Sequence, residues 1–424
     1  MRIMYLSKKI AMLLEQQIRE VHQYQKEYFK ESSKGQERNL LNKIDLTDNH
    51  IKIITGIRRS GKSTLLMQLL SKTNHFNFLS FEDPRLAGFD VNDFFKLERI
   101  FQSNNDSNIY FFDEIQNIKG WEQFVRTLHD KKIRVIISGS NASLLSKELG
   151  TSLTGRQLTY ELYPFSFEEF LRFNKYEPEI LSFQKYIELG GLPEYLKSKN
   201  IDILIQLFND LVYRDIVVRY QLRNANIVRD LGVYLASNVG KEFSYNKLAN
   251  TFELGSANTL KSYISYFCDA YLFFIIPRFS YSLKQQAKNQ KKIYGIDTGL
   301  MTSLSLSFSK DKGRILENTV FIELKRRKKE IYYYKKKKEC DFIVSNKKKI
   351  ESIIQVCYEL NADNLERELS GLKEAMNDLG HNNGLILTLN QDEQLSDNNY
   401  NIIVKPVWKW LLEKPLNKKS TSKL

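Results

Sequence analysis

The sequence predicts an α/β fold with a parallel sheet at its core, and three observations indicate this fold class. Short apolar runs of strand type occur at 51–54, 108–112 and 131–138. Segments of helical periodicity separate them, as in chains whose strands and helices alternate. The first run leads into a loop that contains glycine, and the second ends in two carboxylates. Ligands of such sheets bind at the carboxyl ends of the strands.

The loop after the first strand reads G-I-R-R-S-G-K-S-T and fits the phosphate-binding pattern G-x-x-x-x-G-K-[ST]. Its glycines let the backbone curl, so that N–H groups point at phosphate oxygens. Lys62 is expected to reach the β- and γ-phosphates, and the Ser63 hydroxyl to bind Mg²⁺. The alternative is a plain turn before an amphipathic helix. The predicted ATP-binding residues are Gly56, Arg59, Ser60, Gly61, Lys62, Ser63 and Thr64.

The second strand ends in Asp113 and Glu114, 51 positions beyond Lys62. Asp113 is expected to hold Mg²⁺ opposite Ser63. Glu114 is expected beside the γ-phosphate, where a carboxylate can orient and polarise the attacking water. Alone, an apolar strand that ends in acids is common; together with the loop, it predicts hydrolysis of ATP as well as binding.

Polar residues follow the third strand at Ser140 and Asn141. They are expected either to face the γ-phosphate and sense its presence, or to cap the helix that begins at 142. Arg156, just before a strand at 157–162, is a candidate arginine finger, in its own site or in that of a neighbouring subunit. The alternative is a cation favoured by the end of a helix.

The chain resembles the prokaryotic AAA-type ATPases that carry a winged-helix segment and a restriction-endonuclease-like C-terminal domain. The matching motifs are G-I-R-R-S-G-K-S-T, F-F-D-E-I-Q (111–116), S-G-S-N-A-S-L-L (138–145), L-T-G-R (153–156), Y-E-L-Y-P-F-S-F-E-E-F (160–170), G-G-L-P-E (190–194), I-D-T-G-L (296–300) and L-E-N-T-V-F-I-E-L (316–324). They occur in order and cover nearly the whole chain.

The resemblance implies a P-loop NTPase core with a parallel sheet, then a helical lid, a winged-helix domain and a C-terminal α/β endonuclease-like domain. The expected boundaries are 1–45 for an N-terminal helical segment, 46–164 for the ATPase core, 165–210 for the lid, 211–298 for the winged helix, 299–412 for the endonuclease-like domain and 413–424 for a basic disordered tail. It also makes Pro193 a candidate contact to the bound base, although a plain turn between two lid helices is an equal alternative.

The pattern of the winged-helix segment is three short helices and a hairpin. The helices are expected at 227–239, 244–251 and 256–269, and the strands at 271–277 and 291–296, with a polar, basic loop between the strands. The third helix would enter a major groove with Asn258, Lys261 and Ser262 on its exposed side. The alternative is packing against the lid or a protein partner.

Charge favours a nucleic-acid partner. The chain has a formal net charge of +14, and residues 284–350 contain 19 Lys plus Arg against 7 Asp plus Glu, a net of +12. Such a concentrated basic segment is typical of polyanion binding. Tyr332, Tyr333 and Tyr334 could stack on exposed bases. The alternative is a set of solvated hairpin loops with the tyrosines packed on a sheet.

A nuclease of the restriction-endonuclease-like fold needs an acid on its first helix, an Asp at a strand and an acid-x-Lys on the next strand. Glu317 and Asp341 match the first two positions, but Gln355 and Cys357 stand where Glu and Lys are expected. A neutral amide is a poor Mg²⁺ ligand, and a thiol cannot act as an ammonium. The pattern therefore predicts a degenerate nuclease site, with active cleavage as the minor alternative.

Composition agrees with several globular domains in a reducing cytoplasm. Three cysteines without a C-x-x-C pair exclude a disulfide framework and a cysteine-rich zinc site. No apolar stretch approaches the roughly 20 residues that span a bilayer. The sequence thus predicts a cytoplasmic, ATP-hydrolysing switch or motor that acts on DNA through residues 256–350. The alternatives are a regulatory ATPase with a protein partner and an ATP-gated, Mg-dependent DNA nuclease. Under each interpretation, the chain could also form a homo-oligomer.

Overall fold

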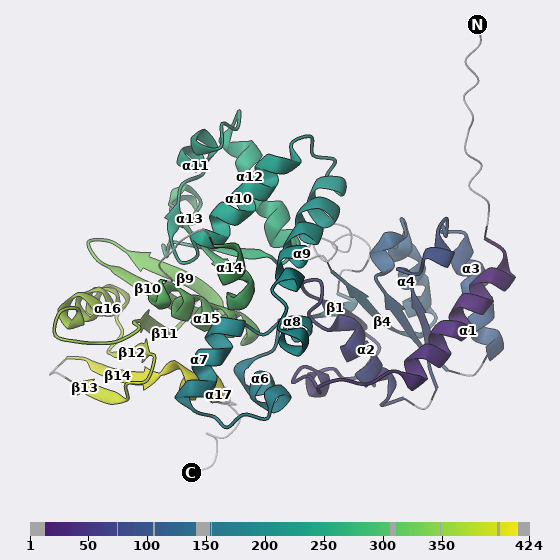
Figure 1. Ribbon diagram of the computed structural model, residues 1–424, viewed down its shortest axis with the longest axis horizontal. Helices are drawn as coiled ribbons and strands as arrows, with labels where there is room; N and C mark the ends of the chain where they lie inside the picture. The colour runs from purple at the N-terminus through teal and green to yellow at the C-terminus, as the bar shows by residue number, and fades with distance from the viewer. Residues whose placement is uncertain are drawn as a thin grey trace, which may run out of the picture. The chain divides into compact units, whose positions relative to one another are not determined.

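The computed structural model describes residues 13–73, 75–104, 107–140, 153, 155–305, 311–347, 349–396 and 399–413. These residues form two compact units (Figure 1). The first takes its residues from 1–56 and 61–162, and the second from 57–60 and 163–424. The predicted lid, winged-helix segment and C-terminal domain therefore lie together in one unit.

The first unit is built on a five-stranded parallel sheet, which confirms the predicted fold class. Its strands lie in the order β2-β3-β4-β1-β5. The bounds are β1 Ile51–Thr55, β2 Asn77–Ser80, β3 Ile109–Asp113, β4 Arg134–Gly139 and β5 Gln157–Glu161. The helices are α1 Glu15–Glu31, α2 Lys62–Leu70, α3 Asp93–Asn104 and α4 Trp121–Asp130.

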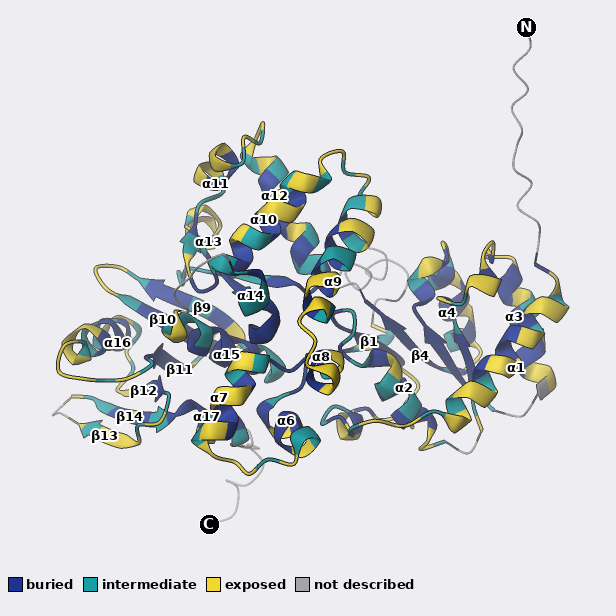
Figure 2. Cartoon of the chain, viewed as in Figure 1, coloured by how far each residue is buried: buried dark blue, intermediate teal, exposed yellow. Residues whose placement is uncertain are grey.

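Both faces of this sheet are covered, which explains why its strands read as continuous apolar runs. Adjacent side chains of β3 point to opposite faces, so Phe111 and Phe112 belong to different hydrophobic clusters. The Phe111 cluster includes Leu65 and Leu69 of α2, and the Phe112 cluster includes side chains of α1, α3 and α4. Figure 2 shows the buried strands between partly exposed helices.

The sheet register brings the predicted site to one edge. Thr55 of β1 pairs with Gly139 of β4, and Phe112 of β3 pairs with Ile137 of β4. The segments after these three strands therefore leave the sheet side by side. β5 runs parallel to β1 with Ile51 opposite Gln157, so the residue that precedes β5 lies at the opposite edge.

The second unit begins with helices and continues with a three-stranded sheet in the order β6-β8-β7. The helices are α6 Phe167–Asn174, α7 Ile180–Leu189, α8 Pro193–Ser198, α9 Asp202–Asp210, a π-helix at Leu211–Val218, α10 Ala225–Ser237, α11 Tyr245–Thr251, α12 Ala257–Asp269, α13 Leu283–Lys288 and α14 Thr298–Leu304. The strands are β6 Glu242–Phe243, β7 Phe273–Pro277 and β8 Lys291–Gly295. For the winged-helix segment, the sequence predicted three helices and two strands, but it predicted neither strand β6 nor helix α13.

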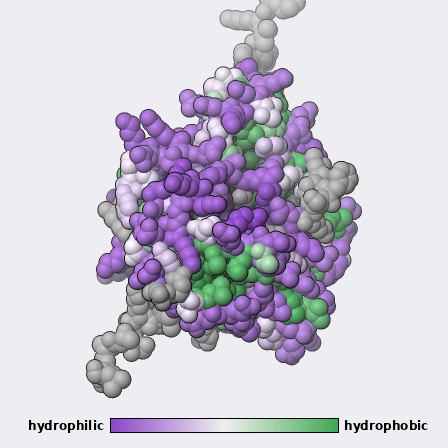
Figure 3. Space-filling model, turned by 90° about the vertical axis from the view of Figure 1, so that its left-hand side faces the viewer, coloured by the Kyte–Doolittle hydropathy of each residue, from purple (hydrophilic) through white to green (hydrophobic). Residues whose placement is uncertain are grey.

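A mixed six-stranded sheet completes the second unit, in the order β13-β14-β12-β11-β10-β9. Its elements are α15 Lys312–Arg326, β9 Glu330–Lys335, β10 Glu339–Asn346, β11 Lys349–Val356, α16 Leu365–Leu379, β12 Asn383–Thr388, β13 Glu393–Ser396, β14 Asn401–Pro406 and α17 Val407–Leu412. On the face shown in Figure 3, most side chains are hydrophilic, and a hydrophobic area lies low in the centre of the view, with further hydrophobic side chains at the lower right and near the top. Among the described residues, no helix is long and apolar enough to cross a bilayer.

Asp297 joins segments of the second unit that are far apart in sequence. Its carboxylate accepts hydrogen bonds from the amide of Gly191 at 2.6 Å and from that of Leu300 at 2.9 Å. Gly190 has a φ of 72°, and a Cβ there would clash with Asp297. The Arg326 guanidinium donates to the Phe165 carbonyl at 3.1 Å. The turn after α7 is thus held to α14, and the segment before α6 to α15.

Candidate functional site

The phosphate-binding loop has the backbone that its glycines predict. Gly56 and Gly61 have positive φ angles, of 154° and 93°, and a Cβ at Gly56 would clash with the carbonyl of Leu162. Gly61 is the N-cap of α2. The Lys62 side chain is buried, and its ammonium donates to the Gly56 carbonyl at 3.1 Å. The helix N-terminus and the lysine together give this loop the positive charge that a phosphate requires.

The remaining predicted loop residues differ in their surroundings. Ser60 is buried, Ser63 is exposed, and Thr64 is half-buried in the first turn of α2. Arg59 has a φ of 63°, and its guanidinium lies 3.4 Å from Glu194 and 3.3 Å from Asp210. These two carboxylates belong, like Arg59, to the second unit.

Asp113 lies in contact with the loop, as the sequence predicts. The Ser63 hydroxyl donates to one Asp113 oxygen at 2.9 Å, and the Ser138 hydroxyl donates to the other. Burial, together with the charge of Glu114, raises the pKa of Asp113 to about 6. A hydroxyl and a carboxylate at this distance are the kind of oxygen donors that Mg²⁺ takes from a protein. Ser63 and Asp113 therefore fit the predicted metal.

Glu114 lies beside the lysine and beside the end of the third predicted strand. Its carboxylate is 3.8 Å from the Lys62 ammonium and accepts a hydrogen bond from the Ser140 hydroxyl at 3.2 Å. The Gln116 amide also donates to it. The φ of Glu114 is 50°, an uncommon left-handed conformation for a residue with a side chain. The structure thus places Ser140 against Glu114, and Asn141 lies outside the described residues.

Arg156 lies far from these groups. Its carbonyl accepts a hydrogen bond from the Ile51 amide at 2.8 Å, at the start of β1, whereas the loop follows the end of that strand. Five strand residues separate the two edges, a distance of about 16 Å at roughly 3.3 Å per residue. Its guanidinium lies 3.3 Å from Asp130. A finger role in its own site does not fit this placement, and a role in a neighbouring subunit stays a prediction.

Pro193 is the first residue of α8 in the second unit, directly after the glycine turn that Asp297 holds. The proline suits this position, because its missing N–H would have no partner in a first helical turn. The plain-turn alternative explains this geometry. Contact with a nucleotide base stays a prediction.

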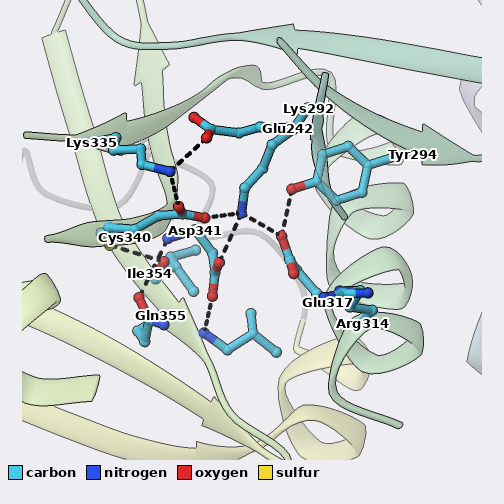
Figure 4. A network of polar contacts seen from close by, with 12 residues as sticks. Glu242, Lys292, Tyr294, Arg314, Glu317, Lys335, Cys340, Asp341, Ile354 and Gln355 are labelled. Carbon is cyan, nitrogen blue, oxygen red and sulfur yellow. Dashed lines mark hydrogen bonds and ion pairs between the residues drawn. The ribbon is translucent and has the colours of Figure 1, made fainter. Parts of the chain in front are cut away.

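Two of the four predicted nuclease residues, Glu317 and Asp341, meet around a lysine that the sequence did not single out (Figure 4). The Lys292 ammonium lies 3.0 Å from Glu317 and 3.1 Å from Asp341, and its side chain is 2% exposed. Gln355 donates its amide to Glu368 at 2.7 Å and accepts a hydrogen bond from the Asp341 backbone at 3.4 Å.

Cys357 is buried just beyond β11 and packs in the hydrophobic cluster beneath α16. Its thiol donates to the Glu359 carbonyl at 3.0 Å. Burial, together with the charge of Glu368, raises the pKa of this thiol to about 11. The thiol is therefore neutral at physiological pH, and it serves the core rather than a metal.

Burial and neighbouring charges shift the pKa values of Glu317 and Lys292 in this cluster. Burial, with the nearby charge of Asp341, raises the pKa of Glu317 to about 7. Burial alone would lower the pKa of Lys292, but Glu317, Tyr294 and Asp341 raise it well above its ordinary value. The lysine is therefore charged in this network.

Sequence reasoning missed Ser138, Lys292 and Tyr294. Ser138 lies within the motif S-G-S-N-A-S-L-L, so its position at the end of β4 could have suggested a partner for Asp113. Lys292 and Tyr294 are two positions apart in β8, so their side chains point to the same face of the strand. In the sequence, however, they follow a polar, basic loop and resemble its continuation. No local signal links them to Glu317, 25 and 23 residues further on.

Comparison with protein families places three matches along the chain. Residues 48–171 match the AAA domain, residues 180–312 match a domain of unknown function, DUF8612, and residues 312–410 match another, DUF4143. The AAA match covers the loop, Asp113, Glu114 and Arg156.

Curated relatives span most of the chain. The uncharacterized protein MJ1544 of Methanocaldococcus jannaschii is 38% identical over 87% of this chain and 90% of its own length. An uncharacterized protein of Haemophilus influenzae is 32% identical over 73% of this chain and 83% of its own length. Among solved structures, AMPPCP-bound DnaA from Aquifex aeolicus is 15% identical, with a TM-score of 0.27 over 58% of this chain and 87% of that chain.

Proposed function

We propose that this chain, which belongs to the same family as MJ1544 and contains an AAA domain, is a magnesium-dependent ATPase that acts as a molecular switch. The observation that carries this proposal is the contact between Ser63 and Asp113, at 2.9 Å. This contact brings the phosphate-binding loop next to the end of strand β3. A metal that both Ser63 and Asp113 bind requires that they lie this close together.

Each residue of the site has a distinct task in this proposal. The loop amides and Lys62 would bind the phosphates, while Ser63 and Asp113 would hold magnesium. Magnesium, when bound with ATP, would neutralise charge on the phosphate oxygens. Glu114 would orient and polarise the attacking water, and Ser140 would hold the Glu114 carboxylate in place.

Two variants test this proposal. Lys62→Ala is expected to abolish binding of Mg-ATP, measured by isothermal titration calorimetry. Glu114→Gln is expected to leave binding intact and to lower turnover by about 10²–10⁴-fold, the range for loss of a general base. Glu20→Gln, at an exposed site on α1, is the matched control and should behave as wild type. Unchanged turnover in Glu114→Gln would remove Glu114 from the mechanism.

The second part of the proposal is that the ATPase acts on DNA through α12. The three helices α10, α11 and α12 with the sheet β6-β8-β7 have the order of elements of a winged helix. Asn258, Lys261 and Ser262 are exposed on α12. Tyr281, in the loop between β7 and β8, is 82% exposed. A polar helix face beside an exposed wing suits a groove and a phosphate backbone.

Fewer residues of the basic segment 284–350 are available to contact DNA than its sequence indicated. Tyr333 and Tyr334 are buried, with their hydroxyls donated to the Gln290 carbonyl and to carboxylates of α16, so stacking on bases is wrong for both. Several cations of this segment are engaged internally. They are Lys292, Arg326, Arg327, Lys329, Lys335 and Lys336. We therefore place the DNA contact on α12 and the β7–β8 loop.

A salt series tests the DNA contact. A double variant, Lys261→Ala with Lys284→Ala, is expected to weaken binding of duplex DNA and to lower the salt slope by about 2, one for each phosphate that the variant no longer neutralises. Lys336→Ala is the matched control, because its ammonium pairs with Asp378. Absence of binding by wild-type protein at low salt would favour a protein partner. Binding that the double variant leaves intact would instead place the DNA on another surface.

We also propose that the C-terminal domain is a nuclease-like fold without cleavage activity. The order α15-β9-β10-β11-α16-β12 carries Glu317 and Asp341 at the expected places, but Gln355 and Cys357 offer neither a carboxylate nor an ammonium. Incubation of DNA with the protein and Mg²⁺ or Mn²⁺ is expected to leave the DNA intact. Metal-dependent cleavage that Asp341→Ala removes would overturn this part of the proposal.

A further inference from the structure

Lys292 is the centre of a buried ionic network that joins three elements of the second unit. Besides Glu317 of α15 and Asp341 of β10, its ammonium lies 2.9 Å from Glu339. The Tyr294 hydroxyl, from the same strand as Lys292, donates to Glu317 at 2.6 Å. In Figure 4, Lys292 extends from β8 toward the carboxylates of Glu317 and Asp341.

The carboxylate oxygens around Lys292 are nearly all occupied. Asp341 accepts a hydrogen bond from the Val356 amide through its second oxygen, at 3.0 Å. Glu339 has Lys335 at 3.0 Å from its second oxygen. Of the six oxygens of Glu317, Glu339 and Asp341, five thus have a donor from the protein within 3.1 Å.

Burial makes this arrangement costly unless the charges remain paired. Carboxylates removed from water need a cation or hydrogen-bond donors close by. In a metal site, the ion supplies that charge, and oxygen ligands surround it. Here an ammonium with three donor protons contacts three carboxylates, and its side chain is 2% exposed. The protein thus provides its own cation.

We propose that the Lys292 ammonium is the permanent cation of this carboxylate cluster, and that it fastens strand β8 to α15 and β10 without a metal. The same interface has a second attachment nearby. The Phe279 amide donates to the Tyr333 carbonyl at 2.7 Å, and the Tyr333 hydroxyl donates to the Gln290 carbonyl at 2.8 Å. The three-stranded sheet and the six-stranded sheet are therefore joined at two places, and divalent ions leave their junction unchanged.

The proposal is tested with Mn²⁺ on nucleotide-free protein that carries Asp113→Asn, which removes the carboxylate ligand proposed for the metal of the ATP site. With Lys292 present, we expect no calorimetric signal and no shift of the thermal unfolding midpoint on addition of Mn²⁺. Lys292→Ala in the same background is expected to unfold at a lower temperature and to bind Mn²⁺, which should restore part of the lost midpoint. Lys291→Ala is the matched control, because its ammonium donates to the Asn289 carbonyl at 2.9 Å, outside the cluster.

Two outcomes would overturn the proposal. The first is Mn²⁺ binding by the Lys292-containing protein that Asp341→Asn abolishes, since it would mean that the cluster takes a metal despite the lysine. The second is equal thermal stability of the Lys292→Ala and Lys291→Ala proteins. If Lys292→Ala does not fold, the titration of the Lys292-containing protein decides alone. A variant with Lys292→Met, Glu317→Gln and Asp341→Asn, which removes the cation together with the two buried carboxylates and leaves Glu339 paired with Lys335, should then recover folding.

Discussion

The Ser140 hydroxyl donates a hydrogen bond to the Glu114 carboxylate at 3.2 Å. The two residues follow neighbouring strands, β4 and β3, so the sheet itself sets their separation. Ser138, two residues earlier, donates to Asp113 instead. Two serines at the carboxyl end of β4, one within the strand and one just after it, therefore support two different acids. One acid is proposed to position water and the other to hold magnesium.

Ser140→Ala is expected to lower turnover by about tenfold, because a carboxylate that loses one orienting hydrogen bond spends less time in the productive geometry. Affinity for Mg-ATP should stay within about twofold of wild type. Steady-state phosphate release and calorimetry measure the two quantities. Ser138→Ala is the control, and it should weaken Mg-ATP binding instead. Equal effects of both variants on affinity would contradict this division of roles.

Asp113→Asn is expected to weaken binding of Mg-ATP at least about tenfold, because a neutral amide is a poorer ligand for Mg²⁺ than a carboxylate. Affinity for ATP in EDTA should change little, since no metal is then present. Calorimetric titrations with and without Mg²⁺ provide the comparison. An equal loss of affinity in both buffers would mean that Asp113 supports the loop rather than the metal.

Arg156→Ala should leave ATP binding unchanged, because Arg156 lies at the opposite edge of the sheet from the loop. If Arg156 acts on a neighbouring subunit, turnover per wild-type subunit should rise with protein concentration. Mixing Arg156→Ala with Lys62→Ala protein should then restore activity, since some interfaces combine an intact loop with an intact arginine. Turnover that Arg156→Ala leaves unchanged would assign Arg156 to its pair with Asp130 alone.

Asp297→Ala is expected to destabilise the second unit by about 2–4 kcal/mol, because the amides of Gly191 and Leu300 would lose a buried acceptor. Asp311→Ala is the matched control. Asp311 also caps a helix, α15, but at an exposed position, so its loss should cost only about 1 kcal/mol. Chemical denaturation of both variants measures the difference. Similar values for the two would show that the bond to Gly191 contributes little.

The raised pKa of Glu317, about 7, predicts that stability falls as pH rises. Between about pH 4.5 and 7, the folded state keeps a proton that the unfolded state releases, so folding loses up to about 3 kcal/mol across this window. Above pH 7 the contribution is constant. Asp113, with its pKa raised to about 6, acts in the same direction. The test is therefore thermal unfolding of Asp113→Asn with and without Glu317→Gln, and the second protein should show the shallower pH dependence.

The sequence predicted the parallel sheet and the neighbourhood of the loop because these depend on local patterns. A strand, a glycine loop and a helix are contiguous, and each parallel strand places its following residues at one edge. The contact between Ser63 and Asp113 follows from that rule. By the same rule, Arg156 lies at the other edge of the sheet, because it precedes its strand. The rule could be applied to Arg156 only once β5 was known to pair with β1 in the same sheet.

The sequence could not separate the two interpretations of the tyrosines at 332–334. Three consecutive tyrosines between two basic runs fit both an exposed stacking platform and a strand that packs on a sheet. The neighbours decide, and they are Gln290 and residues of α16, more than 35 positions away. The same holds for Lys292, since nothing near it in sequence indicates three carboxylates.

The contacts of Asp297 and Lys292 determine where the chain can be divided. The families that match it meet at residue 312, a natural place to cut when a shorter protein is wanted for crystallisation. A fragment that begins there would keep Glu317 and Asp341 but lack Lys292, and so would present two buried acids without their cation. We expect such a fragment to aggregate when it is expressed, whereas a fragment that begins at residue 163 keeps every partner of both residues named here.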